Sequence, residues 1–180
     1  MRIAVSGAHG AGKTTFCNDL AEALKKQGKS VEVKTDVARS LRDDGVPINR
    51  GTEESQYPLF LEKHLDNLFQ EYDSDFVLYD RTMLDTIAYA TANGNLDAKW
   101  LAFLRKNLTH ILRTIDIYFY IPIEFGIEDD GVRATETEYQ TKVDHALLDI
   151  LKECWPKVVT LTGSREERAK KAMKCIVARK

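Results

Sequence analysis

The sequence has few cysteines, no long apolar run and little net charge. Its three cysteines, Cys17, Cys154 and Cys175, lie far apart without CxxC or Cys/His spacing, so neither a disulfide framework nor a zinc site is expected. No apolar stretch approaches the length that crosses a bilayer, and no charged-then-apolar leader precedes the first predicted strand. We therefore expect a cytoplasmic protein with reduced cysteines and no membrane partner.

The charge balance gives no general attraction to polyanions. The chain carries 26 Lys and Arg against 28 Asp and Glu, so contact with nucleic acid or an anionic membrane needs a local basic patch. Residues 164–180 supply one candidate, with seven Lys or Arg against two Glu. A solvated face of a terminal helix explains the same composition.

The order of predicted elements indicates an α/β fold in one domain, residues 1–180. Apolar runs predict strands at 2–6, 31–35, 76–79, 117–121 and 158–162. Helical spacing predicts helices at 13–26, 53–72, 82–93, 97–114, about 135–154 and after Ser164, where Ser164 is the predicted N-cap of a capping box with Glu167. Alternating strands and helices favour an open parallel sheet covered by helices on both faces. Ligands of such sheets collect at the carboxyl ends of the strands.

The first strand is followed by a phosphate-binding pattern. Residues 7–14 read GAHGAGKT, which fits G-x-x-x-x-G-K-[ST] and predicts that the chain binds a nucleoside triphosphate. Glycine lets backbone N–H groups turn toward phosphates, and the following helix directs its positive end at them. The predicted nucleotide-binding residues are Gly7, His9, Gly10, Ala11, Gly12, Lys13, Thr14 and Thr15.

Three side chains of this loop have predicted chemical roles. Lys13 reaches the β- and γ-phosphates, Thr14 places its hydroxyl on Mg²⁺, and Thr15 assists at the α-phosphate. A glycine-rich turn before a surface helix is the structural alternative. In such a turn, however, other residues would serve as well as Lys13 and Thr14, so this alternative does not explain why lysine and threonine follow the glycine.

Charged residues follow the second and third predicted strands. Asp80 is a candidate to hold the Mg²⁺ water shell, and Arg81 to anchor an anionic or hydroxylated acceptor. Asp36 can accept the proton of an acceptor hydroxyl, and both Asp36 and Arg39 are candidates to bind the acceptor. The structural alternatives are a helix N-cap for either aspartate and pairing of Arg81 with Asp85 one turn later.

The segment after the fourth strand is charged and contains glycine. Residues 128–133 read EDDGVR, and such a segment can close over phosphates so that Arg133 stabilises transition-state charge. A solvated loop with local ion pairs is the alternative.

A stripe of Tyr57, Phe60 and His64 recurs at helical spacing and is expected to pack mostly in the core. Tyr57 is the first candidate to stack a base. Its neighbour Gln56 has an amide that can read a base edge.

The assembled motifs resemble those of P-loop nucleoside and nucleotide kinases, particularly the group containing nicotinamide riboside kinase-like proteins. The resemblance rests on GAHGAGKTT at 7–15, DVAR at 36–39, YDRTMLDTIAY at 79–89 and EDDGVR at 128–133. It implies a three-layer fold with strand order 2-3-1-4-5 and a mobile lid at about 124–135. It also implies that Asp80 serves the metal, Arg81 the acceptor and Arg133 the phosphates.

The expected function is an ATP- and Mg²⁺-dependent kinase that transfers the γ-phosphoryl group to a hydroxyl or phosphate of a small nucleoside or nucleotide. We expect a monomer or homodimer, and ATP is the default donor because no N/T-K-x-D guanine-reading motif follows a later strand. One alternative keeps the chemistry but uses a hydroxyl of DNA or RNA, with the basic terminal helix as its support. A second alternative is a nucleotide-dependent regulatory ATPase.

Overall fold

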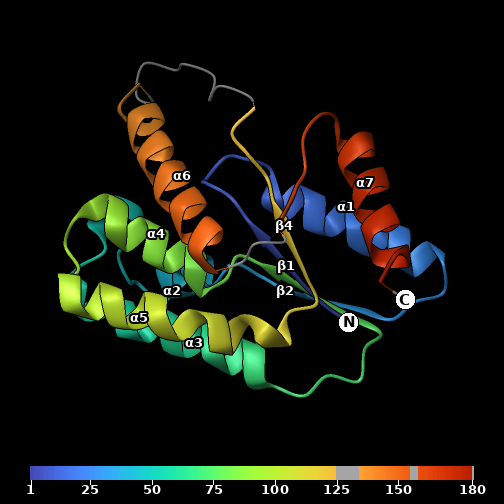
Figure 1. Cartoon of the computed structure of the whole chain (residues 1–180), viewed down its shortest axis with the longest axis horizontal. Coiled ribbons are helices and arrows are strands. Elements are labelled where there is room, and N and C mark those ends of the chain that lie inside the picture. The colour runs from blue at the N-terminus through green and yellow to red at the C-terminus, as the bar shows by residue number, and fades with distance from the viewer. Residues whose placement is uncertain (125–133, 155–157, 180) are drawn as a thin grey trace.

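A five-stranded parallel sheet forms the centre of the molecule (Figure 1). The computed structural model describes residues 1–124, 134–154 and 158–179. The strand order is β2-β3-β1-β4-β5, which confirms the order that the resemblance implied. The strands are β1 (Arg2–Ser6), β2 (Val31–Lys34), β3 (Phe76–Asp80), β4 (Ile117–Tyr120) and β5 (Val159–Thr160).

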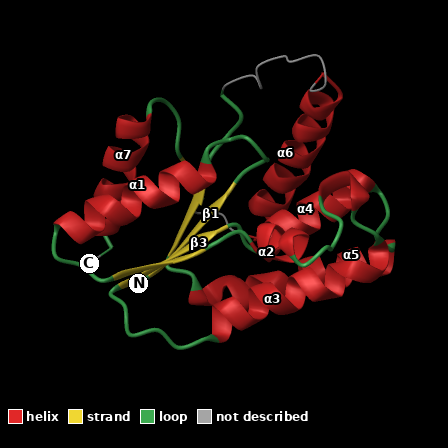
Figure 2. Ribbon diagram, turned by 180° about the vertical axis from the view of Figure 1, so that it is seen from behind, coloured by secondary structure: helices red, strands yellow, loops and turns green. Residues whose placement is uncertain are grey.

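Helices cover both faces of this sheet, so the predicted three-layer fold is confirmed. Figures 1 and 2 show α1 and α7 together on one face and α3, α4, α5 and α6 on the other. The helices are α1 (Lys13–Lys26), α2 (Val37–Asp43), α3 (Tyr57–Phe69), α4 (Met83–Asn93), α5 (Ala98–Ile111), α6 (Ala134–Cys154) and α7 (Arg165–Val177). Three short 3₁₀ segments join them, η1 (Asn49–Gly51), η2 (Glu54–Gln56) and η3 (Leu112–Thr114).

Alternation along the strands divides the core into two halves. In β1, Ile3 and Val5 pack with the residues of α1 and α7, whereas Ala4 packs with those of α4 and α6. Because successive side chains of a strand point to opposite faces, a strand buried on both faces reads as a continuous apolar run. The continuous apolar runs of β1, β3 and β4 therefore agree with the position of these strands in the middle of the sheet.

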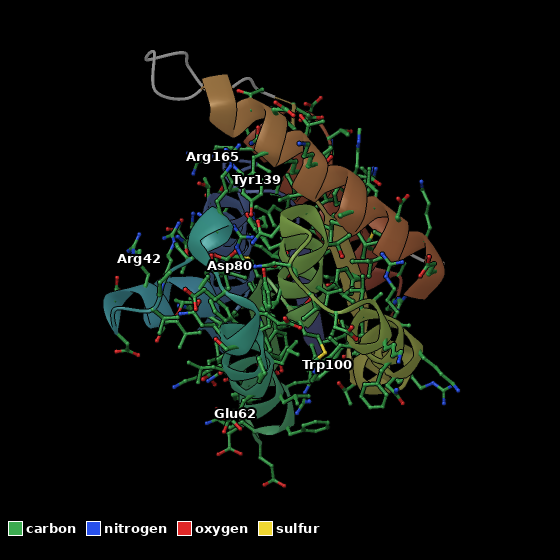
Figure 3. The ribbon with its side chains drawn as sticks, turned by 90° about the vertical axis from the view of Figure 1, so that its left-hand side faces the viewer. Arg42, Glu62, Asp80, Trp100, Tyr139 and Arg165 are labelled. Carbon is green, nitrogen blue, oxygen red and sulfur yellow. The ribbon has the colours of Figure 1, made fainter. Side chains whose placement is uncertain are left out.

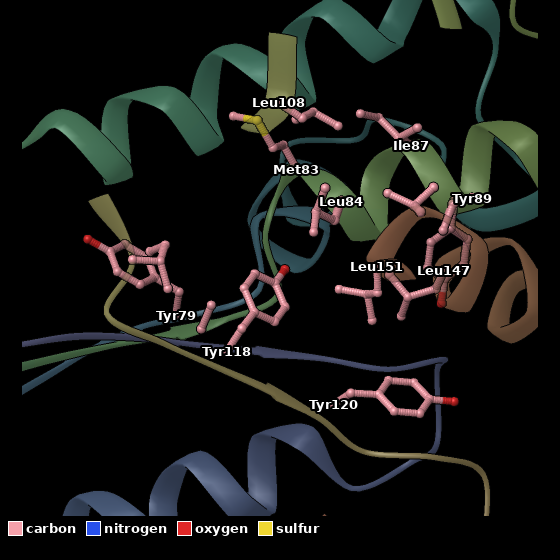
Figure 4. Packing of buried hydrophobic residues seen from close by; sticks show 14 of the residues in the cluster. Tyr79, Met83, Leu84, Ile87, Tyr89, Leu108, Tyr118, Tyr120, Leu147 and Leu151 are labelled. Atoms are coloured by element: carbon pink, nitrogen blue, oxygen red, sulfur yellow. The ribbon is translucent and has the colours of Figure 1, made fainter. Parts of the chain in front are cut away.

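The half of the core under α4 and α6 contains several tyrosines that rise from the sheet (Figure 4). Tyr118 is fully buried, and its hydroxyl lies 2.8 Å from the Ser6 hydroxyl. Tyr120 donates to both carboxylate oxygens of Asp144 on α6, at 2.8 Å each. The rings of Tyr118 and Tyr120 fill apolar space while their hydroxyls contact Thr82 at the start of α4 and Asp144 on α6, which fixes both helices against the sheet. The buried hydroxyl of Tyr79 has no hydrogen-bond partner among the described residues.

Several helix ends differ from those predicted by periodicity. The helix predicted at 53–72 begins as η2 and becomes α-helical only at Tyr57. Glu53 and Gln56 form a capping box around the 3₁₀ turn, and Pro58 lies in the first turn of α3, where a missing N–H costs no hydrogen bond. The predicted capping box of Ser164 with Glu167 at the start of α7 is confirmed.

Most of the segment expected to form a lid, and all of its EDDGVR motif, lie outside the described residues. Among the helices that are described, none is both long and apolar enough to cross a membrane. The extent of the chain as a single domain stays a prediction.

Replacing Leu147 of α6 with alanine tests the packing of this helix on the sheet. Leu147 is fully buried in the α4/α6 half of the core, so the variant should lower the free energy of unfolding by about 2–5 kcal/mol. Denaturant unfolding measures the change. Leu148→Ala is the matched control, because that neighbouring side chain is only partly buried. Equal losses for the two variants would contradict the assigned helix face.

Candidate active site

The loop between β1 and α1 lies against the end of β4. A Cβ atom on Gly7 would collide with the carbonyl oxygen of Ile121, so this first glycine is required by close approach of the backbone. Gly12 has φ +90° and forms the N-cap of α1, a left-handed conformation that favours glycine. The loop therefore leads directly into the N-terminus of α1, whose positive end is the part of a helix that binds phosphate.

Lys13 begins α1 and is buried with its ammonium group turned back over the loop. Its Nζ donates to the carbonyl oxygen of Ala8 at 2.6 Å. Burial, together with the neighbouring Arg81 charge, lowers the pKa of Lys13 to about 7. A polyphosphate bound at the loop would favour the charged form of Lys13.

Asp80 meets Thr14 at the carboxyl end of the sheet. Val5 and Asp80 are paired in the parallel register of β1 and β3, so the Asp80 side chain points to the same face as Val5, where α1 lies. Thr14 Oγ1 donates to Asp80 Oδ2 at 2.6 Å. The other carboxylate oxygen, Oδ1, is buried and has no hydrogen-bond partner among the described residues.

These two side chains fit a magnesium site. Mg²⁺ prefers oxygen ligands and is commonly held by one or two protein groups together with phosphate oxygens. The unpartnered Asp80 Oδ1 and the hydroxyl of Thr14 supply such oxygens next to the phosphate-binding loop. Within the described parts of the chain no group of three or more His, Cys, Asp or Glu could hold a metal ion.

Arg81 follows β3 and has a left-handed backbone conformation, with φ +78°, that is unusual for any residue other than glycine. Such strained positions persist where the surrounding structure fixes them. Arg81 Nε donates to Asp36 Oδ2 at 2.7 Å, and Nη1 donates to the Tyr89 hydroxyl at 3.3 Å. Burial alone would lower the pKa of Arg81, but Tyr89, Asp36 and Asp85 raise it above the ordinary value.

Asp36 caps a helix, as one interpretation of its sequence position proposed, and it also pairs with Arg81; its role as a base stays a prediction. Its Oδ1 accepts from the backbone N–H of Ala38 at 2.9 Å and caps α2, while its Oδ2 accepts from Arg81. The carboxylate lies at the cavity wall and is buried. The hydrogen bond from Ala38 fixes the rotamer of Asp36, so the second carboxylate oxygen is held in place for Arg81.

Asp85 is a buried carboxylate whose role the sequence did not reveal. It accepts from the Ser6 hydroxyl at 2.5 Å, from the Gly7 N–H at 3.3 Å and from the Thr82 N–H at 2.9 Å. Burial raises the pKa of Asp85, against the influence of Arg81 and Lys13. The Asp85 carboxylate lies 3.9 Å from Arg81 Nη1, as the structural alternative proposed, but it also anchors the start of the phosphate-binding loop.

A cavity of about 400 Å³ extends from the loop toward α2, η1 and α3. It brings together Gly10, Gly12, Lys13, Thr14 and Thr15 of the loop with Asp36, Arg39, Tyr57 and Arg81 of the predicted acceptor side; His9, Arg42, Phe60, His64, Asp85, Thr86 and Tyr89 also line it. Figure 3 shows Asp80 deep between the helices and Arg42 at the outer edge of α2. Asp80 does not line this cavity itself, but it contacts Thr14, which does.

His9 connects the loop to the helices beyond it. Its Nδ1 lies 3.1 Å from the Tyr89 hydroxyl, and its ring centroid lies 5.8 Å from that of Tyr139 on α6. The backbone carbonyl of His9 accepts from the Gln140 amide. Through Tyr89, which also accepts from Arg81, the loop is linked to the acceptor side.

The two residues predicted to read a base are placed differently. Tyr57 lines the cavity, and its hydroxyl donates to Asn95 and accepts from Asn93. Gln56 is not brought to the cavity, because its Oε1 accepts from the Glu53 N–H at 2.8 Å in the capping box of η2. A capping role competes with base reading for the same amide.

His64 is a further cavity residue, which the sequence placed mostly in the core. It is buried, and its Nε2 lies 3.2 Å from Thr86 Oγ1. Burial lowers the pKa of His64 to about 4. The imidazole of His64 and the hydroxyl of Thr86 therefore form a polar contact in the cavity wall beside Phe60.

Arg133 lies outside the described residues, so its predicted role at the phosphates stays a prediction.

The basic terminal helix α7 is less free to bind nucleic acid than its composition suggests. Arg168 is buried, Arg165 forms a bidentate pair with Asp19 of α1, and Lys171 donates to the carbonyl oxygen of Thr160.

Comparison with known proteins identifies the family. The sequence model described as AAA domain matches residues 2–168. The chain belongs to this family. Its sequence is also similar to a thymidylate kinase of Alcanivorax borkumensis, with 30% identity over 166 residues, 85% of this chain and 79% of that protein. A probable thymidylate kinase of Archaeoglobus fulgidus is 32% identical over 140 residues, 74% of this chain and 69% of that protein.

Solved structures show the same fold. A NadR protein in complex with NR matches with TM-score 0.73 and 21% identity over 96% of this chain, which spans about half, 50%, of the NadR chain. A deoxyadenosine kinase from M. mycoides matches with TM-score 0.68 and 17% identity over 100% of both chains. A thymidylate kinase from Ehrlichia chaffeensis matches with TM-score 0.65 and 20% identity over 98% of both chains.

The predicted enzyme class is thereby confirmed: the chain is a P-loop kinase, a nucleotide-binding transferase. The resemblance to P-loop nucleoside and nucleotide kinases is confirmed at the same level. The individual site residues and the identity of the acceptor stay predictions.

Lowering the pH should destabilise this kinase through His64. Burial lowers the pKa of His64 from its ordinary value of 6.5 to about 4 in the folded protein, so between these values the unfolded chain binds a proton that the folded chain does not. The free energy of unfolding therefore decreases as the pH falls from 6.5 to 4, by about 3 kcal/mol from this group. Thermal unfolding across this range measures the effect, and His64→Gln should show a flatter profile. Parallel profiles for the two proteins would contradict this assignment.

Proposed function

We propose that the protein transfers the γ-phosphoryl group of ATP, with Mg²⁺, to a small nucleoside or nucleotide. The observation that carries the proposal is that one cavity joins the phosphate-binding loop to the buried Asp36–Arg81 pair. A phosphoryl donor and an acceptor group would meet between Lys13 and that pair. The names of the similar proteins support this acceptor class, since they include thymidylate kinases and a deoxyadenosine kinase.

Each part of the site has a role in this reaction. The loop amides and Lys13 hold the phosphate oxygens and neutralise charge that develops during transfer. Thr14 and Asp80 would hold Mg²⁺, which when bound supplies positive charge to the β- and γ-phosphate oxygens. Arg81 aligns the acceptor with the donor, because its guanidinium is fixed from two sides by Asp36 and Tyr89.

Within this acceptor class, Asp36 favours a hydroxyl. An alcohol must lose its proton as it attacks phosphorus, and a carboxylate at the cavity wall can accept that proton. A phosphate acceptor needs no such base and would be repelled by Asp36, although Arg39 and Arg42 at the same wall would offset part of that repulsion. A nucleoside is therefore the first acceptor to test, and a nucleoside monophosphate the second.

Asp80→Asn tests the metal-binding assignment. The amide keeps the size of the side chain and can still accept from Thr14, but it has no negative charge for Mg²⁺. We expect kcat to fall by a factor on the order of a hundred or more, with the unfolding transition preserved. The measurement is ADP release with ATP and Mg²⁺ across nucleosides, including nicotinamide riboside, nucleoside monophosphates and single-stranded DNA. Lys13→Ala serves as the blank, and full activity of Asp80→Asn would refute the assignment.

Asp36→Asn separates the two kinds of acceptor. Asparagine is as good an N-cap as aspartate, so α2 should keep its start while the base is lost. With a hydroxyl acceptor we expect kcat to fall by about 10²–10⁴-fold; with a phosphate acceptor only the weakened contact with Arg81 remains, so the loss should be smaller. A variant that retains wild-type turnover on every nucleoside would exclude Asp36 as the base. Stimulation of wild-type turnover by DNA alone would instead favour the nucleic-acid kinase.

A further inference from the structure

Arg168 of α7 is a buried arginine that contacts the phosphate-binding loop from outside the cavity. Only 5% of its surface is exposed. Its Nη1 donates to the carbonyl oxygen of Ala11 at 3.3 Å, across 157 positions of sequence. A Cβ atom on Gly12 would lie 3.4 Å from the same nitrogen. The guanidinium therefore packs directly against the Ala11–Gly12 peptide.

The second guanidinium nitrogen is held by Glu124, which follows β4. Arg168 Nη2 donates to Glu124 Oε2 at 2.6 Å. Both carboxylate oxygens of Glu124 also accept from the N–H of Gly163, at 3.0 and 2.9 Å. The pKa of Glu124 is lowered mainly by the hydrogen bond from Arg168. One ion pair thus connects α7, the chain after β4 and the turn before α7.

This contact bears on the direction of a loop amide. A trans peptide is planar, and its C=O and N–H groups point in opposite directions. A donor that fixes the Ala11 carbonyl therefore also fixes the Gly12 N–H on the opposite side. Gly12 lines the cavity and Ala11 does not, which fits a peptide whose N–H side, opposite the Ala11 carbonyl, faces the phosphate-binding space.

We propose that Arg168 is a positioning residue for nucleotide binding: together with Glu124 it holds the Ala11–Gly12 peptide in the orientation that presents the Gly12 N–H to phosphate. The inference rests on the proposed function in that it takes the loop ligand to be ATP. It adds a role for two residues that lie outside the phosphate-binding motif. Arginine suits the role because its planar fork serves both partners at once, whereas a lysine ammonium on a flexible stem is not oriented toward two.

The test compares Arg168→Ala with Arg165→Ala. Arg165 lies three residues earlier on the same helix, and its pair with Asp19 at 2.6 and 2.9 Å ties α7 to α1 without touching the loop. Calorimetric titration with a non-hydrolysable ATP analogue and Mg²⁺ gives Kd, and steady-state assays give KM for each substrate. We expect Arg168→Ala to raise Kd and KM for ATP about tenfold or more and to leave KM for the acceptor unchanged. Arg165→Ala should change each constant less than about twofold.

Two conservative variants keep the test decisive if Arg168→Ala does not fold. Arg168→Lys retains the charge near Glu124, and Glu124→Gln retains an acceptor for Arg168 without the charge. Both should bind the ATP analogue more weakly than the wild type and more tightly than a folded Arg168→Ala. Wild-type affinity in both would overturn the inference, as would equal ATP affinity in Arg168→Ala and Arg165→Ala.

Failure of this inference is distinguishable from failure of the proposed function. If the wild type does not bind the ATP analogue, both are overturned. If the wild type binds and turns over ATP, but the Arg168 and Glu124 variants do so with unchanged constants, only the positioning role is overturned.

Discussion

The structure depends on a cluster of opposite charges buried at the carboxyl edge of the sheet. Lys13, Asp36, Asp80 and Asp85 are buried, and Arg81 is nearly so. A buried ion without a partner costs several kcal/mol, so each of these side chains is stable in its buried position only when the opposite charges lie beside it. The phosphate-binding loop, the end of β3 and the starts of α2 and α4 are therefore arranged around one set of charges.

This site has two halves, the phosphate-binding loop and the proposed acceptor side. The loop is held by Asp85 through the Gly7 N–H and by the packing of Gly7 against Ile121. The acceptor half is built from α2, η1, α3 and α4, which contribute separate side chains to the cavity. Kinases named for different acceptors share this fold, since function depends on the residues of the site rather than on the fold.

Asp36 had two plausible roles in the sequence, and the structure shows one of them. It caps α2 with one oxygen and pairs with Arg81 through the other, a contact that the sequence did not predict, while its role as a base stays a prediction. Gln56 followed the prediction less well, because a local capping box engages its amide. Side-chain atoms of a short polar residue can serve two partners, and a sequence pattern does not say which atom faces which.

The sequence by itself determined the phosphate-binding loop, the alternation of strands and helices, and the capping box of Ser164, because these depend on residues within a few positions of one another. Strand order came from resemblance and was confirmed by the parallel register. Only the tertiary structure placed His64 against Thr86 and Arg168 against Ala11. Helical spacing marks a buried face, but the partner of a buried polar group comes from a distant segment, and no local pattern encodes which segment folds against it.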